Sequence, residues 1–289
     1  MKIHFTKFNY WPTTVLIVIF QLLLLIFPGK KLELDRVSVL VTPHKNPQNP
    51  LVSVVIPAFN EGKFLARTLR SVLDQDYENF ELIVVDNKST DDTSKIAENF
   101  GAKVIFEPKQ GVGFARQRGF LEARGKVIAT TDADTILPSY WLSRIVKEFE
   151  KDRNLVAFGG GFTLYSGPIT AKISVSLAYP VWILDKVFSG GWSLPGANLA
   201  LKKEAFLEVG GFRTELKLGE DADICQRLKA IGKVALAHNF LVQTSGRRFK
   251  NGLFCGLASY APPLFVPKYR YLINYVLGKI FKVSSGLEK

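Results

Sequence analysis

Lys126-Val-Ile-Ala-Thr-Thr-Asp-Ala-Asp134 is the stretch that decides the fold of this chain. Its apolar residues predict a buried strand over 126–132, and two carboxylates close the stretch with one residue between them. A pair of this spacing, placed where a strand meets a loop, suits a divalent cation that binds oxygen ligands and also holds a diphosphate. Because Asp-x-Asp occurs by chance in many loops, the surrounding sequence has to support this interpretation.

Segments typical of strands and helices alternate around this stretch. Strands are predicted at 51–57, 80–86, 102–106 and 126–132, and helices at 62–75, 91–100 and 113–124. Repeated βα units with nearly continuous Val and Ile runs predict an α/β fold, in which a mostly parallel sheet is covered on both faces. Ligands of such sheets bind at the carboxyl ends of the strands.

Four carboxylates lie at the ends of predicted strands: Glu61, Asp86, Asp132 and Asp134. Since the carboxyl ends of parallel strands meet at one edge, these side chains are expected to converge. Helix capping is the alternative role for such residues, and it suits Asp91 or Asp92. Residues that only cap helices need not lie at the same edge of the sheet. The expected convergence of these carboxylates at one edge therefore favours a ligand site.

Composition and charge narrow the class of protein. The 289 residues, of which 47% are hydrophobic, can bury one large core or two modest ones. Cys225 and Cys255 are too few for a disulfide framework and fit small buried side chains. The net charge is +12, and residues 247–289 hold eight Lys or Arg against one acid. Apolar stretches interleave these charges, which favours a membrane surface over nucleic acid; a merely solvated basic face is the alternative.

Residues 1–31 are expected to form an N-terminal hydrophobic membrane anchor. The run Trp11 to Phe27 is almost uncharged and would form a helix of about 25 Å, against a hydrocarbon core of about 30 Å. A cleaved signal peptide is the alternative, but no small-x-small cleavage site follows the run. Lysines flank it on both sides, so charge does not settle its orientation.

The rest of the chain divides into three parts by composition. Residues 32–50, which are rich in proline near their end, are interpreted as a linker, and 51–249 as the folded catalytic domain. Residues 250–289 are expected to be a membrane-associated region of apolar and amphipathic helices. Within it, 269–283 is an apolar helix with a narrow polar stripe, which suits either the membrane interface or packing against the domain. A further apolar helix is predicted over 169–188.

Four segments in a fixed order resemble the family 2 glycosyltransferases of the GT-A fold. They are Val54-Val-Ile-Pro-Ala-Phe-Asn-Glu61, Ile83-Val-Val-Asp-Asn-Lys-Ser-Thr-Asp91, Thr131-Asp-Ala-Asp134, and Gly210-Gly-Phe212 followed by Gly219-Glu-Asp221. Each segment is common alone, whereas the ordered set is specific. The resemblance implies a Rossmann-like fold of the nucleotide-diphospho-sugar transferases, and inverting transfer of a sugar from a nucleotide diphosphate donor.

The resemblance also implies how the donor is held. A divalent metal, Mg²⁺ or Mn²⁺, would be bound directly by Asp134, with Asp132 contacting the ribose or the metal through water. Metal or cationic groups are needed there because the leaving nucleoside diphosphate gains negative charge. The residues expected to form the nucleoside pocket are Pro57, Ala58, Glu61 and Asp86.

Inversion by direct displacement needs a general base that accepts the proton of the acceptor hydroxyl. Asp221, which opens a predicted helix over 221–228, matches the Glu-Asp motif of the family and is the candidate base. Glu220 would orient the site or contact the acceptor. An acid at a helix N-terminus without any catalytic role is the alternative interpretation.

Three further positions carry weaker signals. Arg116 lies where family members place a residue near the nucleotide, although an exposed helix arginine is the alternative. Gly196 would allow close backbone approach, and Asn198 could bond the sugar or the acceptor.

Cationic side chains near the end of the domain suggest contacts with metal or phosphate. His238 follows the strand predicted over 233–237 and could complete the metal site, although lone histidines are more often structural. Arg247 and Arg248 could clamp the diphosphate, because guanidinium groups suit phosphate oxygens. The Gln-x-x-Arg-Trp signature of processive synthases is missing, since Gln226-Arg227 lies in the predicted helix over 221–228 and lacks the Trp.

Two other functions are alternatives to glycosyl transfer. A sugar nucleotidyltransferase should carry a Gly-rich phosphate loop after the first strand, where Pro57-Ala-Phe-Asn-Glu61 stands instead. A non-catalytic membrane scaffold would be expected to have lost Asp134 or Asp221, and both are present. The hydrophobic ends predict a lipid-linked or glycolipid acceptor at a membrane and no nucleic-acid partner. Because the sugar nucleotides implied by the resemblance are mostly cytosolic, the domain is expected to face the cytoplasm.

Overall fold

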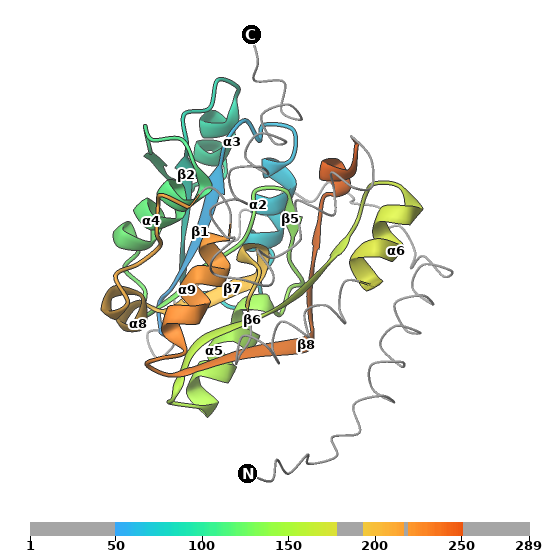
Figure 1. The fold of residues 1–289 in the computed structure, drawn as a ribbon. Helices are drawn as coiled ribbons and strands as arrows, with labels where there is room; N and C mark the ends of the chain where they lie inside the picture. Colours follow the sequence, from blue (N-terminus) through green and yellow to red (C-terminus); the bar gives the residue numbers. More distant parts are fainter. Residues whose placement is uncertain (1–49, 178–192, 217–218, 251–289) are drawn as a thin grey trace.

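Within residues 50–177, 193–216 and 219–250, which the computed structural model describes, eight strands form one mixed sheet (Figure 1). The strands are β1 (Val52–Ala58), β2 (Phe80–Asp86), β3 (Lys103–Phe106), β4 (Val127–Thr130), β5 (Thr135–Ile136), β6 (Leu155–Leu164), β7 (Leu199–Lys202) and β8 (Lys233–Thr244). Their order across the sheet is β3-β2-β1-β4-β7-β6-β8-β5.

The two halves of this sheet differ in strand direction. Strands β3, β2, β1 and β4 are parallel, as the βα pattern predicts. In the other half β7 runs antiparallel to β4 and β6, and β5 runs antiparallel to β8, while β6 and β8 are parallel. The prediction of a mostly parallel sheet therefore holds only for the first half. Strand direction in the second half depends on long-range pairing, which apolar periodicity does not reveal.

Helices connect and cover the strands. They are α2 (Leu65–Leu73), α3 (Thr93–Asn99), α4 (Val112–Glu122), α5 (Trp141–Lys151), α6 (Ile169–Leu177), α8 (Lys203–Glu208) and α9 (Glu220–Leu228), with the short 3₁₀ turns η1 (Gly196–Asn198) and η2 (Gly246–Phe249). The helices predicted before residue 132 all form, with ends within three residues of the expected ones. The helix predicted over 169–188 is present as α6 up to Leu177, and its remainder lies outside the described residues.

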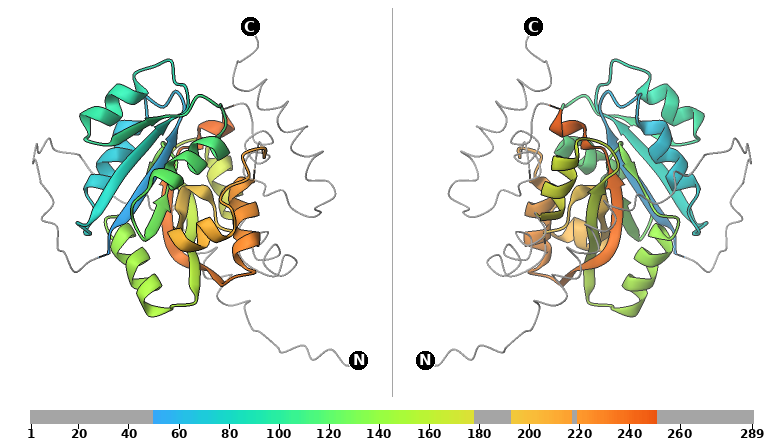
Figure 2. Two further views of the ribbon diagram at one scale, coloured as in Figure 1. Left: turned by 90° about the vertical axis from the view of Figure 1, so that its left-hand side faces the viewer. Right: turned by 90° about the vertical axis from the view of Figure 1, so that its right-hand side faces the viewer.

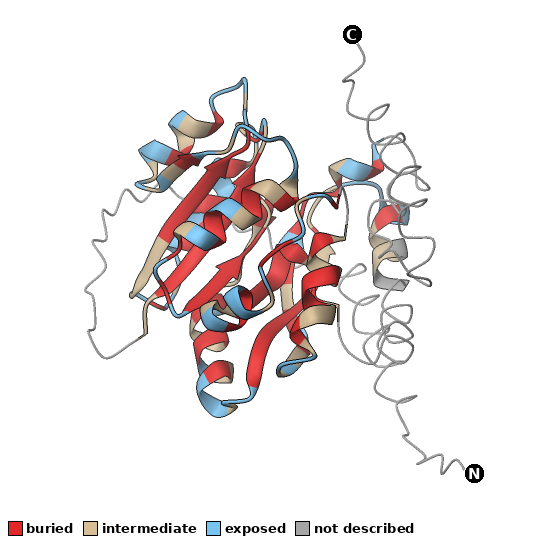
Figure 3. Cartoon of the chain, turned by 60° about the vertical axis from the view of Figure 1, so that its left-hand side comes forward, coloured by how far each residue is buried: buried red, intermediate tan, exposed pale blue. Residues whose placement is uncertain are grey.

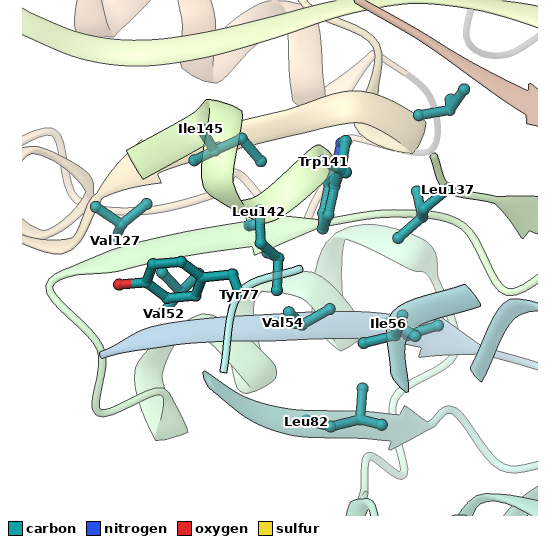
Figure 4. Packing of buried hydrophobic residues seen from close by; sticks show 14 of the residues in the cluster. Val52, Val54, Ile56, Tyr77, Leu82, Val127, Leu137, Trp141, Leu142 and Ile145 are labelled. Carbon is teal, nitrogen blue, oxygen red and sulfur yellow. The ribbon is translucent and has the colours of Figure 1, made fainter. Parts of the chain in front are cut away.

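Side chains alternate between the two faces of the parallel half, as the pleat of a strand requires. Val54 and Ile56 of β1 pack with Trp141 in the cluster beneath α2, α3 and α5, which Figure 4 shows from close by. Val55, between them, packs with Phe120 in the cluster beneath α4, α8 and α9. The two groups of helices lie on opposite sides of the sheet (Figure 2). The central strands β1 and β4 are wholly buried between them (Figure 3).

The register of the parallel strands aligns their carboxyl ends. Ala58 pairs with Asp86, and Thr130 pairs with Val55. Continuing this register by two residues brings Asp132 level with Pro57. The loops after β1, β2 and β4 therefore start at one edge of the sheet, as expected for a ligand site.

The end of β8 reaches this same edge from the other half of the sheet. Thr135, next to Asp134, pairs with Thr244 at the end of β8. The turn η2 follows at once. Gly246 lies so close to the loop after β6 that a Cβ on it would lie 2.2 Å from the carbonyl oxygen of Ser166. This close crossing brings η2 beside the Asp132 to Asp134 turn.

In the part of the chain that the structure describes, no helix combines the length and apolar character needed to cross a membrane. The predicted anchor over 1–31 lies outside that part, as does the predicted C-terminal region over 250–289 apart from Lys250. Cys225 is buried, as expected, whereas Cys255 is outside the described residues.

Candidate functional site

A pocket of about 420 Å³ opens at the shared edge of the strands. Its wall contains residues from the loops after β1, β2, β3 and β4 and from η2. The lining residues are Pro57, Ala58, Phe59, Glu61, Asn87, Gln110, Gly111, Val112, Ala115, Asp132, Ala133, Asp134, Arg247 and Arg248. The structure thus brings together seven of the predicted donor-site and metal-site residues: Pro57, Ala58, Glu61, Asp132, Asp134, Arg247 and Arg248.

The turn after β4 presents its two carboxylates to this pocket. Ala133 between them is buried in the core, and its carbonyl accepts a hydrogen bond of 2.8 Å from the hydroxyl of Thr68 in α2. The backbone N–H of Thr135 donates to the carbonyl of Asp132 and closes the turn. With the middle side chain held inward, the carboxylates of Asp132 and Asp134 lie on the pocket side.

Arg247 of η2 binds two carboxylates across the pocket. Its Nε lies 2.9 Å from Oδ2 of Asp134, and its Nη1 donates to Oε2 of Glu61 at 2.7 Å. Nη2 donates to the other oxygen of Glu61, so that pair is bidentate. The guanidinium also lies over the ring of Phe64, 4.9 Å from its centroid. Arg247 is thereby held at the junction of β1, β4 and β8.

Burial shapes the ionisation of this cluster. It raises the pKa of Glu61 and of Asp134, and the Arg247 charge opposes the rise in both. Burial alone would lower the pKa of Arg247, but its hydrogen bond to Glu61 and the charge of Asp134 raise it overall. The arginine is thus a permanent cation beside two carboxylates that are costly to keep ionised without a counter-charge.

A second arginine, Arg116 of α4, lies behind Asp132. Its side chain is only 4% exposed, and its Nη2 lies 2.7 Å from Oδ1 of Asp132. Nη1 donates to Oε1 of Glu220 at the start of α9. The prediction offered a nucleotide contact or an exposed helix position for Arg116; the structure instead buries it, and it is not among the residues that line the pocket.

The start of α9 carries the predicted base. Asp221 accepts hydrogen bonds of 2.8 Å from the backbone N–H of Gly196 and from its own neighbour Ala222. Burial raises the pKa of the adjacent Glu220 to about 7, although the Arg116 charge opposes the shift. Glu220 and Asp221 do not line the pocket itself; Arg116 connects them to its Asp132 wall.

The structure gives Gly196 and Asn198 roles other than contact with a sugar. A Cβ on Gly196 would lie between 2.2 and 2.5 Å from the guanidinium of Arg116, so the glycine makes room for that side chain. Asn198 is fully buried: its amide donates to the carbonyls of Gly161 and Phe240 and accepts from Nε1 of Trp141. These bonds join β6, β8 and α5, and they leave Asn198 inaccessible to a ligand.

Two other predicted residues are not brought to the pocket surface. Asp86 accepts from the backbone N–H of Ser89 and the hydroxyl of Ser94, so it orders the loop after β2 rather than lining the cavity. His238 does not follow a strand, because β8 continues to Thr244. It lies at an exposed bulge whose neighbour Asn239 binds Arg144 of α5, and it is absent from the pocket lining.

Comparison with known proteins agrees with this geometry. Residues 53–185 match the family model described as glycosyl transferase family 2. This segment is therefore similar to family 2 glycosyl transferase domains. An uncharacterised glycosyltransferase of Mycobacterium bovis is 37% identical over 105 residues, which cover 36% of this chain and 46% of that protein. The chain therefore spans about half the length of that curated relative.

Solved structures share the fold of this domain. A mannosyltransferase from Pyrobaculum calidifontis in complex with GDP-Man and Mn²⁺ has a TM-score of 0.55 and 18% identity, and the match covers 97% of this chain and 84% of that one. Glucosyl-3-phosphoglycerate synthase from Mycobacterium tuberculosis, in complex with Mn²⁺ and UDP, has a TM-score of 0.54 and 21% identity, with 74% and 79% covered. These likenesses support the Rossmann-like GT-A fold predicted from the four ordered segments.

The carboxylates of the domain fit a divalent cation by their chemistry. Asp132 and Asp134 share one wall of the pocket, and phosphate-site Mg²⁺ is typically held by one or two carboxylates together with phosphate oxygens. Among the described residues, no group of three or more His, Cys, Asp or Glu is placed to hold a metal. The set therefore suits a cation whose shell is completed by a bound diphosphate.

Sequence reasoning missed the wall that follows β3. Asn87 donates to the carbonyls of Glu107 and Lys109 and accepts from the N–H of Gly111, which fixes the loop leading into α4. Gly111 itself has φ of 142°, a conformation that favours glycine. The available signal was the Gly111-x-Gly113 pair, since the third parallel strand ends at the same edge as its neighbours.

Proposed function

We propose that this protein is an inverting glycosyltransferase that moves a sugar from a nucleotide diphosphate donor to a lipid-linked or membrane-proximal acceptor, with a divalent metal. The observation that carries the proposal is the pocket wall at the strand ends, where Asp132 and Asp134 face Arg247 and Arg248. Carboxylates for a cation and guanidinium groups for phosphate oxygens are what a metal-bound diphosphate requires.

Asp134 and Asp132 would hold the metal, which when bound neutralises charge on the diphosphate. Pro57, Ala58 and the loop of Asn87 would enclose the nucleoside. Arg247 would leave Asp134 and Glu61 to bind phosphate oxygens, with Arg248 beside it. Structures of similar fold contain GDP-Man or UDP, so both kinds of nucleotide are candidate donors.

On the acceptor side, Asp221 would take the proton of the attacking hydroxyl. The acceptor oxygen forms a bond to the anomeric carbon as the bond from that carbon to the diphosphate oxygen breaks, and the proton passes to Asp221. Two backbone N–H groups orient this carboxylate, and α9 presents it with the positive end of the helix. Direct displacement from the opposite face inverts the anomeric configuration.

The membrane part of the proposal is supported by sequence. The apolar run Trp11 to Phe27 and the basic, apolar segment over 250–289 flank the domain and suit attachment to a bilayer. A polyprenyl phosphate or a glycolipid is the acceptor class that such an attachment favours. The domain would then face the cytoplasm, where a nucleotide sugar donor is available.

A screen of nucleotide sugars with the full-length protein in detergent tests the proposal. Mn²⁺-dependent hydrolysis of one donor is expected, with faster turnover once a lipid acceptor is added. Asp134→Ala and Asp221→Ala should each abolish transfer while remaining folded by circular dichroism. Full transfer by either folded variant would refute the proposal, and a requirement for a nucleoside triphosphate would indicate a nucleotidyltransferase instead.

A further inference from the structure

One guanidinium lies where four elements of the domain meet. Arg116 extends from α4, binds Asp132 in the loop after β4, and binds Glu220 at the start of α9. Its guanidinium lies against the backbone of Gly196 in η1, where no side chain larger than hydrogen fits. Gly196 in turn donates its N–H to Asp221. Asp132 in the pocket wall and the helix end that carries Asp221 are thus joined through the side chain of Arg116.

The burial of Arg116 distinguishes it from a ligand-binding arginine. Its side chain is 4% exposed and does not line the pocket, and its Nε is buried without a hydrogen-bond partner. A charged group is costly to bury, and here it is stabilised by carboxylates from two different elements. Arg116 binds only Oδ1 of Asp132. The other carboxylate oxygen is therefore available on the pocket side.

We propose that Arg116 is a positioning residue that sets the spacing between the donor-side carboxylate Asp132 and the α9 terminus that presents Asp221. The inference rests on the proposed function. A guanidinium suits this role because its two Nη groups donate in fixed directions within one plane. A lysine has a single terminal nitrogen and cannot hold both carboxylates in the same geometry.

Loss of a positioning residue should lower the rate of transfer without weakening nucleotide binding. Misplacement of reacting groups by about 1 Å can lower a rate about 100-fold, even when binding is retained. Arg116→Lys should therefore reduce kcat for transfer by about 100-fold. The Kd for the nucleoside diphosphate with Mn²⁺, measured by calorimetry, should stay within about threefold of wild type, because Arg116 is not in the pocket. The rate of slow donor hydrolysis should fall less than the rate of transfer, because an attacking water molecule needs less orientation than the acceptor.

Gly196→Ala provides an independent test that leaves every charged residue in place. Gly196 does not have the positive φ that would disfavour alanine, so the new methyl acts by displacing the guanidinium. The same loss of kcat with retained nucleotide affinity is expected. Arg118→Lys, on the same helix but with a half-exposed side chain paired to Glu122, is the matched control and should leave kcat unchanged.

A double-mutant comparison shows whether Arg116 acts through Glu220. Because the two residues form one unit, Arg116→Lys combined with Glu220→Gln should be no slower than the slower single variant. Wild-type kcat in both Arg116→Lys and Gly196→Ala, or a loss of nucleotide affinity equal to the loss of kcat, would overturn the inference. If Arg116→Lys does not fold, Gly196→Ala alone decides. A wild-type protein that turns over no nucleotide sugar would instead refute the proposed function.

Discussion

Arg247 and Asp134 form an ion pair across the candidate site, with Nε of the arginine 2.9 Å from Oδ2 of the aspartate. The arginine also holds Glu61. A cation therefore already lies against the carboxylate that is proposed to bind the metal. Metal binding at Asp134 would therefore compete with Arg247 for Oδ2 of this carboxylate.

Removing this competitor should change cation and nucleotide binding in opposite directions. In Arg247→Met, Mn²⁺ alone should bind about tenfold more tightly than in wild type, whereas the nucleoside diphosphate with Mn²⁺ should bind about tenfold more weakly, because its phosphate partner is lost. Calorimetry measures both. Arg70→Met, which removes an arginine stacked over Phe100, is the control. Unchanged or weaker Mn²⁺ binding in Arg247→Met would show that the ion pair does not compete.

Asp221→Asn should separate chemistry from donor binding. The amide keeps the size of the carboxylate but cannot accept the proton, so kcat for transfer should fall by about 100-fold to 10,000-fold. The Kd for the nucleoside diphosphate should be unchanged, because Asp221 does not line the pocket. Asp223→Asn is unsuitable as a control, since Asp223 holds Arg213 and Arg227. The partly exposed Asp152, paired with Lys233, serves instead as Asp152→Asn. A wild-type kcat would assign the base to another residue.

The raised pKa of Glu220 predicts that the stability of the fold depends on pH. Burial raises its pKa from 4.5 to about 7 in the folded state. The folded protein therefore binds this proton more tightly than the unfolded chain does. The resulting contribution to the free energy of unfolding is fully present below about pH 4.5 and is lost as the pH rises through about 7.

Glu220→Gln should remove this part of the pH dependence. The Tm of wild type, measured between pH 5 and 8, should decline more with rising pH than the Tm of the variant. Glu122→Gln is the control, because its carboxylate lies at the surface and its pKa is lowered by Lys103. Parallel Tm profiles for wild type and Glu220→Gln would contradict the raised pKa.

Asn198 should prove structural when it is replaced. Asn198→Ala leaves the Nε1 group of Trp141 and two buried carbonyls without partners, so the free energy of unfolding should fall by about 3 kcal/mol. Urea denaturation measures this loss. The KM for the donor, determined on the folded protein, should match wild type. An increased KM at unchanged stability would restore the sugar-contact role that the sequence suggested.

Local sequence patterns were sufficient to predict much of the first half of the domain. Apolar runs identified β1 to β4, and the convergence of parallel strand ends was enough to place Glu61, Asp132 and Asp134 at one edge of the sheet. These predictions succeed because parallel βα units repeat a local periodicity, and because residues at the ends of neighbouring strands must lie together. The same reasoning did not find the wall at Asn87 and Gly111, since a loop's course depends on side-chain bonds within it.

Tertiary structure alone decided which charged groups meet. Arg116 and Glu220 are 104 residues apart, and Arg247 and Glu61 are 186 apart. Neither pair leaves a periodic signal, because each depends on the long-range pairing of β7, β6 and β8 and on the close crossing at Gly246. For the same reason the sequence does not reveal that Asn198, which it suggested as a sugar or acceptor contact, bonds buried backbone instead. The sequence by itself determines which residues can carry the chemistry. Long-range strand pairing determines which of them become partners, because two charged groups interact only when the fold brings them together.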